Sequence, residues 1–162
     1  VRAMGTPVAA WMIERVELQP GQRVLELAAG PGDTGFLAAE RIEPGGTLVC
    51  SDAADAMLEV ARGRAQELGI ENVEFRRLEL EWIDLPAASI DAILCRWGLM
   101  LSVDPGAALR EARRVLRPGG RIALAVWDSG EQPLGDDSDR RAGVAVPRRS
   151  AAAGHPGDVR PG

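Results

Sequence analysis

The sequence predicts one α/β domain built on a doubly wound parallel sheet, and three observations support that prediction. Short apolar runs alternate with stretches of helical periodicity through the first 127 of the 162 residues, which is typical of strand–helix–strand units with right-handed crossovers. A glycine-rich turn follows the first apolar run. Large apolar residues become rare after about Ser129, so we expect the domain to span residues 1–128 and the Gly/Pro/Arg-rich stretch 129–162 to be disordered.

The first half of the chain is expected to alternate between helix and strand. Thr6 followed by Pro7 is typical of an N-cap with proline at the first helical position. This helix should run to about Leu18, because Pro20 and Gly21 follow it. The elements expected next are a buried parallel strand at 23–28, a helix at 33–41, a strand at 47–51 and a helix at 55–68 that Gly69 caps.

The second half is expected to continue with strands at 73–78, 90–95 and 121–127, and with a helix at 107–116. Helical spacing places Leu109, Ala112 and Leu116 on the face of that helix that meets the sheet. The strand at 121–127 would be an apolar edge strand. An unpaired apolar edge favours pairing with another chain, so self-association is expected there.

Charge and composition exclude several kinds of partner. All 19 basic residues are arginine and stand against 24 acidic ones, giving a net charge of -5, so we expect no basic surface for nucleic acid. No apolar run reaches the roughly 18 residues of a membrane span and no signal peptide opens the chain, which indicates a cytoplasmic protein. Cys50 and Cys95 lie in separate apolar runs without metal-ligand spacing, so we interpret them as reduced core thiols.

The glycine turn has the spacing G-x-G-x-x-G, with glycines at positions 30, 32 and 35 between a strand and a helix. Without a Cβ, Gly30 and Gly32 let the backbone turn sharply and approach a ligand closely. Sites for nicotinamide dinucleotides and for S-adenosylmethionine share this spacing, and a tight connection that binds nothing can also have it. The turn therefore predicts a nucleotide-like site without identifying the cofactor.

Two carboxylates near the turn favour a positively charged cofactor. Glu26 lies just before the turn, where it would repel a pyrophosphate but attract the ammonium and sulfonium groups of S-adenosylmethionine. Asp52 follows the second strand about twenty residues beyond the turn, where an acid can accept hydrogen bonds from both ribose hydroxyls. The alternatives are a Glu26 carboxylate satisfied by backbone amides and an Asp52 that caps the following helix, although Asp55 suits that cap better.

With these residues and Met57 in place, the sequence resembles the class I S-adenosylmethionine-dependent methyltransferase family, in particular its small-molecule branch. The resemblance covers about Leu18 to Trp127 and includes three later segments of that family in the right order, at 78–86, 89–97 and 114–121. It implies a Rossmann-like sheet of seven strands, of which this chain is expected to lack the C-terminal ones.

The resemblance also implies a role for each matching residue. Gly30 and Gly32 would approach the methionine moiety of S-adenosylmethionine, and Asp52 would bind its ribose. Met57 would pack against the adenine, the alternative being a core residue of its helix. The other cofactor-binding residues that it implies are Glu26, Ala28, Ala53, Glu79, Leu80 and Cys95, and the substrate-facing residues are Arg96 and Trp97. Packing and a surface ion pair are the alternatives for Trp97 and Arg96.

Two of these positions depart from the family's usual pattern. Ala28 stands where the family commonly has a glycine, and Glu79 stands where it commonly has an aspartate. The first change is expected to keep the backbone slightly farther from the cofactor, and the second keeps the carboxylate while altering its reach.

The implied function is methyl transfer to a small-molecule acceptor. Because the cofactor carries the reactive methyl group, the protein chiefly aligns the reactants. No general base and no metal site are identified, since the single histidine, His155, lies in the tail. Two alternatives stay open: a non-catalytic module that keeps the fold, and an NAD(P)-dependent oxidoreductase, which Glu26 and the absence of Tyr and Lys disfavour. The tail fits a shifted reading frame, so we interpret the chain as truncated or frameshifted after about residue 130 and leave its own activity open.

Overall fold

Residues 2–127 are described by the computed structural model, with side chains from Pro7 onward. In this part of the chain, helices and strands alternate as expected, except that no helix lies between β3 and β4. Their bounds are α1 (Arg2–Val16), β1 (Arg23–Glu26), α2 (Asp33–Arg41), β2 (Thr47–Asp52), α3 (Asp55–Leu68), β3 (Val73–Arg77), β4 (Ile90–Arg96), the short 3-10 helix η1 (Leu99–Leu101), α4 (Pro105–Val115) and β5 (Leu116–Ala125).

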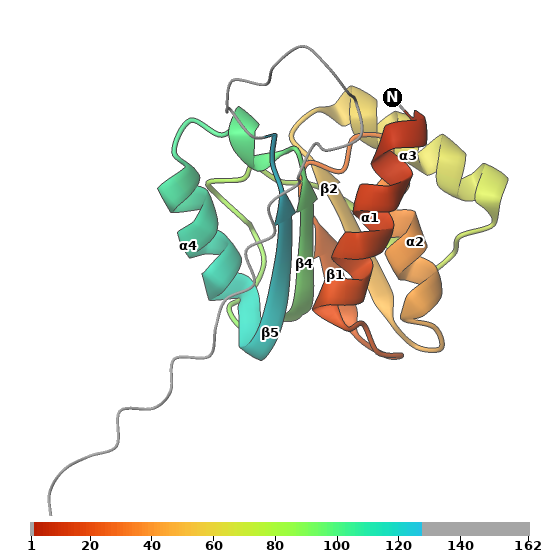
Figure 1. Ribbon diagram of the computed structural model, residues 1–162, viewed down its shortest axis with the longest axis horizontal. Coiled ribbons are helices and arrows are strands. Elements are labelled where there is room, and N and C mark those ends of the chain that lie inside the picture. The colour runs from red at the N-terminus through yellow and green to blue at the C-terminus, as the bar shows by residue number, and fades with distance from the viewer. Residues whose placement is uncertain (1, 128–162) are drawn as a thin grey trace, which may run out of the picture.

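The five strands form one parallel sheet in the order β3-β2-β1-β4-β5, which confirms the predicted doubly wound sheet. The chain builds outward from β1 to β3 and then crosses back to the other side of β1 for β4 and β5. Figure 1 shows the sheet between its helices, with the strands pointing toward one edge. The strand order reverses between β1 and β4, and in open α/β sheets such a reversal places the ligand site at the carboxyl edge.

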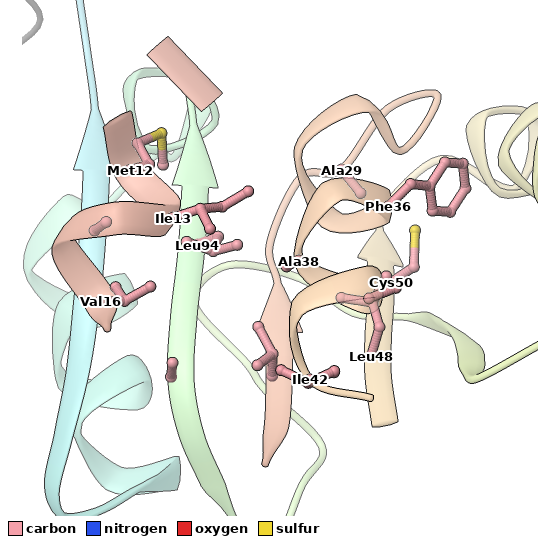
Figure 2. Close-up of a cluster of buried hydrophobic side chains, with 14 of the residues drawn as sticks. Met12, Ile13, Val16, Ala29, Phe36, Ala38, Ile42, Leu48, Cys50 and Leu94 are labelled. Atoms are coloured by element: carbon pink, nitrogen blue, oxygen red, sulfur yellow. The ribbon is translucent and has the colours of Figure 1, made fainter. Parts of the chain in front are cut away.

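One face of the sheet is covered by α1, α2 and α3. Figure 2 shows Ile13 of α1 beside Leu94 of β4, while Ile42, the residue that caps the end of α2, lies near Leu48 of β2. The residues of these three helices and of the α2 C-cap that belong to the buried hydrophobic cluster on this face are Met12, Ile13, Val16, Phe36, Ala38, Ala39, Ile42, Ala61 and Ala65. This packing holds α2, the helix after the glycine turn, directly against the strands that carry Glu26 and Asp52.

The opposite face is covered by α4 and by the segment between β3 and β4, which contributes the buried residues Leu78, Ile83 and Leu85. Consecutive residues of β1 belong to different faces, since Val24 packs with the first cluster and Leu25 with the second. This alternation is expected of a strand that is buried on both sides.

The start of α1 differs from the prediction. The helix begins at Arg2 and contains Pro7 in its interior, so Thr6 is not the N-cap and Pro7 is not the first helical residue. Proline in that position removes one helical hydrogen bond. The helix is held nevertheless by its later turns, where Met12 and Val16 are buried against the sheet.

The buried face of α4 also differs from the prediction. Leu109 is exposed, and the helix packs through Ala108, Ala112 and Val115. These residues have the spacing i, i+4, i+7 and form one face of a helix. Leu116 is the first residue of β5 and pairs with Ile90. The prediction was wrong for Leu109 and Leu116, because the orientation of the helix about its axis, and not the size of a side chain, decides which side chains face the sheet.

The expected disordered tail at 129–162 lies outside the described residues, and so does His155. Within residues 2–127, β5 pairs with β4 alone and is an edge strand, as predicted. No helix in this part of the chain is both long enough and apolar enough to cross a membrane. Both cysteines are buried and outside any disulfide, as the sequence predicts.

Candidate functional site

The glycine turn adopts the sharp bend that the sequence predicts. Gly30 and Gly32 have positive φ angles of 54° and 84°, and Gly32 is the N-cap of α2. A Cβ on Gly32 would collide with the Phe36 ring, whereas a Cβ on Gly30 would meet no atom within 4 Å. Gly30 therefore presents bare backbone toward open space, which suits close approach by a ligand.

Glu26 lies buried beneath the turn, with only 3% of its surface exposed. A Cβ on Gly35 would collide with its carboxylate, so the third glycine of the motif lets α2 pack directly on this acid. Burial is the largest influence on its pKa and raises it to about 8, although the nearby backbone N–H of Gly35 and the Arg96 guanidinium oppose that rise. Its Oε2 has no hydrogen-bond partner.

The protonation of Glu26 refines the charge argument made from the sequence. Glu26 was expected to be ionised, but a buried carboxyl with a pKa of about 8 is mostly protonated at neutral pH. An arriving cation would favour the ionised form and would supply the missing partner for Oε2. Nearby backbone amides only partly satisfy this acid, because one oxygen is left without a hydrogen bond.

Asp52, the last residue of β2, ties the turn to the next helix. Its Oδ2 accepts a hydrogen bond from the Gly30 N–H at 2.8 Å, and its Oδ1 accepts one from the Ala54 N–H at 2.9 Å. Each carboxylate oxygen can accept a further bond. The N-cap of α3 is Ala54, and no side chain caps the helix. Asp52 instead links the glycine turn to the residue before α3 through its two hydrogen bonds, and its oxygens can still accept hydrogen bonds at the sheet edge.

Four predicted residues surround Asp52 along the same edge. Ala53 and Met57 are exposed on the α3 side, and Met57 is not a core residue, because its neighbour Leu58 is the one that is buried. On the other side, the Leu78 N–H donates to the Asp52 carbonyl at 3.2 Å. This bond places the β3 end beside Asp52, and it is followed by an exposed Glu79 and a half-buried Leu80.

The three predicted residues at the end of β4 differ in burial: Cys95 lies in the core, whereas Arg96 and Trp97 are partly exposed. Cys95 is 1% exposed, and burial raises the pKa of its thiol to about 11, so its side chain belongs to the core. The other two predicted residues, Arg96 and Trp97, are half-buried at the carboxyl edge. Ala28 faces the same region with a φ of 50°, a conformation that glycine adopts more readily than alanine.

The start of α2 carries a charge cluster that was not predicted from the sequence. Asp33 binds Arg64 of α3 at 2.8 Å and lies 3.6 Å from Arg96 of β4. Arg64 also donates to the Pro31 carbonyl at 2.6 Å, so it braces the glycine turn from outside. These residues are separated by dozens of positions in the chain, and no local pattern indicates their contact.

The arrangement can hold a ligand between carboxylates and bare backbone, with an arginine and indole rings next to it. The described residues contain no group of three or more His, Cys, Asp or Glu that could hold a metal ion.

Comparison with known proteins identifies a family. A model described as a methyltransferase domain matches residues 18–142. The chain is 35% identical over 123 residues to a ubiquinone/menaquinone biosynthesis C-methyltransferase of Ectopseudomonas mendocina, covering 75% of this chain and 48% of that protein. It is also 35% identical over 126 residues to an uncharacterised methyltransferase of Bacillus subtilis, YcgJ, covering 78% of this chain and 49% of that one.

Solved structures agree with these sequence matches. The crystal structure of the Bacillus subtilis protein superposes with a TM-score of 0.70 at 34% identity, covering 74% of this chain and 50% of that one. A methyltransferase from Aquifex aeolicus has a TM-score of 0.71 at 24% identity over 79% of this chain and 68% of its own, which supports the fold. The chain thus spans about half the length of the two curated relatives described above.

Proposed function

The chain belongs to the family of methyltransferase domains, and we propose that it binds S-adenosylmethionine and transfers the methyl group to a small-molecule acceptor. The observation on which the proposal depends is the glycine turn between two carboxylates. Gly30 presents open backbone, Asp52 holds that backbone by a 2.8 Å hydrogen bond, and Glu26 lies below with an oxygen that lacks a partner.

The residues present fit this cofactor. An unpartnered, buried carboxylate oxygen favours a ligand with positive charge over one with a pyrophosphate. Asp52 has acceptor capacity left for two ribose hydroxyls, and the exposed Met57 lies close by in the chain as a surface for the adenine. The cofactor-binding residues proposed are therefore Glu26, Ala28, Gly30, Gly32, Asp52, Ala53, Met57, Glu79 and Leu80, with Arg96 and Trp97 toward the acceptor.

Bound S-adenosylmethionine would supply an electrophilic methyl group, so the protein need contribute mainly alignment. The glycine turn, braced by Arg64 and Asp52, would fix one reactant. The carboxyl ends of β4 and β5 would receive the other. Cys95 is left out of the proposed contacts, because its thiol is buried in the core.

Calorimetry on the 162-residue chain tests the proposal. We expect binding of S-adenosylmethionine and S-adenosylhomocysteine and no binding of NADH. Asp52→Asn should weaken S-adenosylhomocysteine binding by about tenfold or more, because a carboxylate is a stronger acceptor than an amide. Asp84→Asn, at an exposed aspartate in the segment between β3 and β4, is the matched control and should bind as the parent does. Binding of NADH instead would support an oxidoreductase, and binding of none of the three a non-catalytic module.

Two further parts of the proposal concern the surroundings of the protein. The edge of β5 supports self-association, because an apolar edge strand offers unpaired backbone groups. Sedimentation at several protein concentrations would test this, and a concentration-independent monomer would exclude it. The cytoplasmic location stays a prediction from composition.

A further inference from the structure

Arg96 lies on the same face of the sheet as Glu26, closer to the carboxyl edge. Along β4, Leu94 packs with α1 and α2 and Cys95 with the opposite cluster, so the alternation of the strand returns Arg96 to the α1–α2 face. Glu26 pairs with Leu94 in register and lies under α2 on that face, where a Cβ on Gly35 would collide with its carboxylate. Arg96 is also the positive charge that acts on Glu26. Its guanidinium therefore lies where the glycine turn meets the acceptor side of the edge.

The two arginines of the charge cluster differ in how tightly they are held. Arg64 binds Oδ1 of Asp33 at 2.8 Å and the Pro31 carbonyl at 2.6 Å, so the turn occupies its guanidinium. Arg96 lies 3.6 Å from Oδ2 of Asp33, which is longer than a charge-assisted hydrogen bond. Its guanidinium carbon lies 4.6 Å from the centre of the Trp97 ring, and this stacking covers one face of the group while leaving the N–H donors in its plane available. Since a guanidinium carries five such donors, Arg96 keeps donors for a ligand at the sheet edge.

The charges at this point match those of an amino-acid zwitterion. The methionine end of S-adenosylmethionine carries an ammonium and a carboxylate beside the sulfonium. A cation that ionises Glu26 leaves two carboxylates in the site, those of Glu26 and Asp33, and the guanidinium groups of Arg64 and Arg96 balance them. Oε2 of Glu26 lacks a partner and suits the ammonium. The carboxylate of the ligand then needs a cation with free donors, and Arg96 meets that requirement.

We propose that Arg96 binds the α-carboxylate of the methionine moiety of the cofactor, while Glu26 binds its ammonium. This inference rests on the proposed methyltransferase function and adds a specificity-determining residue to it. Arg96 distinguishes the intact amino-acid head group from adenosyl ligands that lack the carboxylate, because such ligands leave its mostly covered charge without a partner. Since Arg96 also faces Asp33, the first residue of α2, the bound carboxylate links the end of β4 to the glycine turn.

Calorimetry with two ligands on the full chain tests this assignment. One ligand is S-adenosylhomocysteine, and the other is its decarboxylated analogue, S-adenosyl-3-thiopropylamine, which keeps the ammonium. The parent should bind S-adenosylhomocysteine about tenfold or more tightly than the amine, because only the former offers an acceptor to the Arg96 guanidinium. Arg96→Gln should weaken binding of S-adenosylhomocysteine about tenfold without weakening that of the amine. Arg96→Lys keeps the charge and should restore part of the difference.

Arg62→Gln is the matched control, because the Arg62 guanidinium also lies over an aromatic ring, 4.8 Å from the centre of Phe75, but at β3. It should keep the parent's preference for S-adenosylhomocysteine over the amine. An Arg96→Gln chain that binds S-adenosylhomocysteine as the parent does would overturn the assignment. Loss of both ligands by the same factor in Arg96→Gln would also overturn it, since that result is expected of a residue that only holds the site in shape.

The same titrations separate this assignment from the function on which it rests. A parent chain that binds neither ligand contradicts the proposed function itself. A parent that binds both ligands with equal affinity leaves cofactor binding in place and overturns the role of Arg96 alone. This comparison uses no variant, so it stands even where Arg96→Gln folds poorly.

Discussion

The two halves of the carboxyl edge are built from different materials. At β1 and β2, the site consists of glycine backbone and two acids, Glu26 and Asp52. The backbone N–H of Gly30 donates a hydrogen bond to Asp52 at 2.8 Å. At β4 and β5 it consists of large side chains, in which Arg96 lies over Trp97 and Trp97 stacks on Trp127. The β1–β2 half suits a ligand that approaches the glycine backbone closely. The β4–β5 half presents side chains that can be substituted without altering the glycine turn.

The difference teaches which changes each half tolerates. The glycine half depends on φ angles and close packing, so a single added Cβ is expected to be costly. The aromatic half depends on stacking between side chains, so substitutions there are expected to change ligand preference more than the fold. Five predictions test this contrast, in order of decreasing effect.

Adding a methyl group to the glycine turn should have the largest effect. Gly32→Ala adds a Cβ that collides with the Phe36 ring, at a residue with a φ of 84°. Gly45→Ala adds a Cβ at a similar φ of 81°, but that Cβ meets no atom within 4 Å. We expect Gly45→Ala to cost about 1 kcal/mol from backbone strain alone, and Gly32→Ala about 3 kcal/mol, because crowding adds to the strain. Urea unfolding of both variants measures the two costs. Equal costs would mean that packing around the turn is loose.

Glu26 should make cofactor binding depend on pH. Its pKa of about 8 means that a cation binds against a protonated acid at lower pH, so affinity for S-adenosylhomocysteine should rise by up to about tenfold per pH unit toward pH 8 and then level off. Glu26→Gln should flatten this profile. Calorimetry between pH 6 and 9 provides the measurement, and a flat profile for the parent would contradict it.

The same group affects stability with the opposite trend. Because the folded pKa lies above the usual value of 4.5, the stabilising contribution is complete below pH 4.5 and is lost as pH rises through about 8. The unfolding free energy of the parent should therefore fall over this range relative to Glu26→Gln. The groups that face Glu26 are Asp33, Arg96, Cys50 and Cys95, and the comparison of the two proteins cancels their own titration.

The tryptophan stack should contribute a smaller amount to stability. A double-mutant cycle with Trp97→Ala and Trp127→Ala should give a coupling of about 1 kcal/mol, which is typical of a stacked aromatic pair. The cycle removes the other contacts of each ring from the result. Coupling near zero in urea unfolding would show that the two rings are merely adjacent.

Ala28→Gly should have the smallest effect. Alanine at a φ of 50° is strained, but glycine costs more entropy on folding, so the net gain should be about 1 kcal/mol or less. The same change removes one of the two collisions that Gly98→Ala would create, since the added Cβ would meet both the Ala28 Cβ and the Cys95 Sγ. We expect Gly98→Ala to unfold more easily alone than in the Ala28→Gly background, as thermal unfolding can measure.

Much of this fold could be predicted from local patterns. The bounds of α2 and α3 match the prediction. Gly32 precedes the first residue of α2 and Gly69 follows the last residue of α3, and both have positive φ angles, 84° and 68°, which interrupt the helix. The start of α1 and the buried face of α4 could not be predicted in this way. Both depend on how a helix packs on the sheet, which a cap signal at Pro7 or a large side chain at Leu109 does not determine.

The sequence by itself determined the alternation of strands and helices, the glycine turn, and the acids at the ends of β1 and β2, since each is a local property of a few neighbouring residues. Only the tertiary structure decided that Asp33, Arg64 and Arg96 meet, that Trp97 stacks on Trp127, and that Glu26 is buried enough to hold its proton near neutral pH. The reason is physical. These contacts join strands and helices that are distant in the chain, and a pKa follows from burial and neighbouring charge, which exist only once the chain has folded.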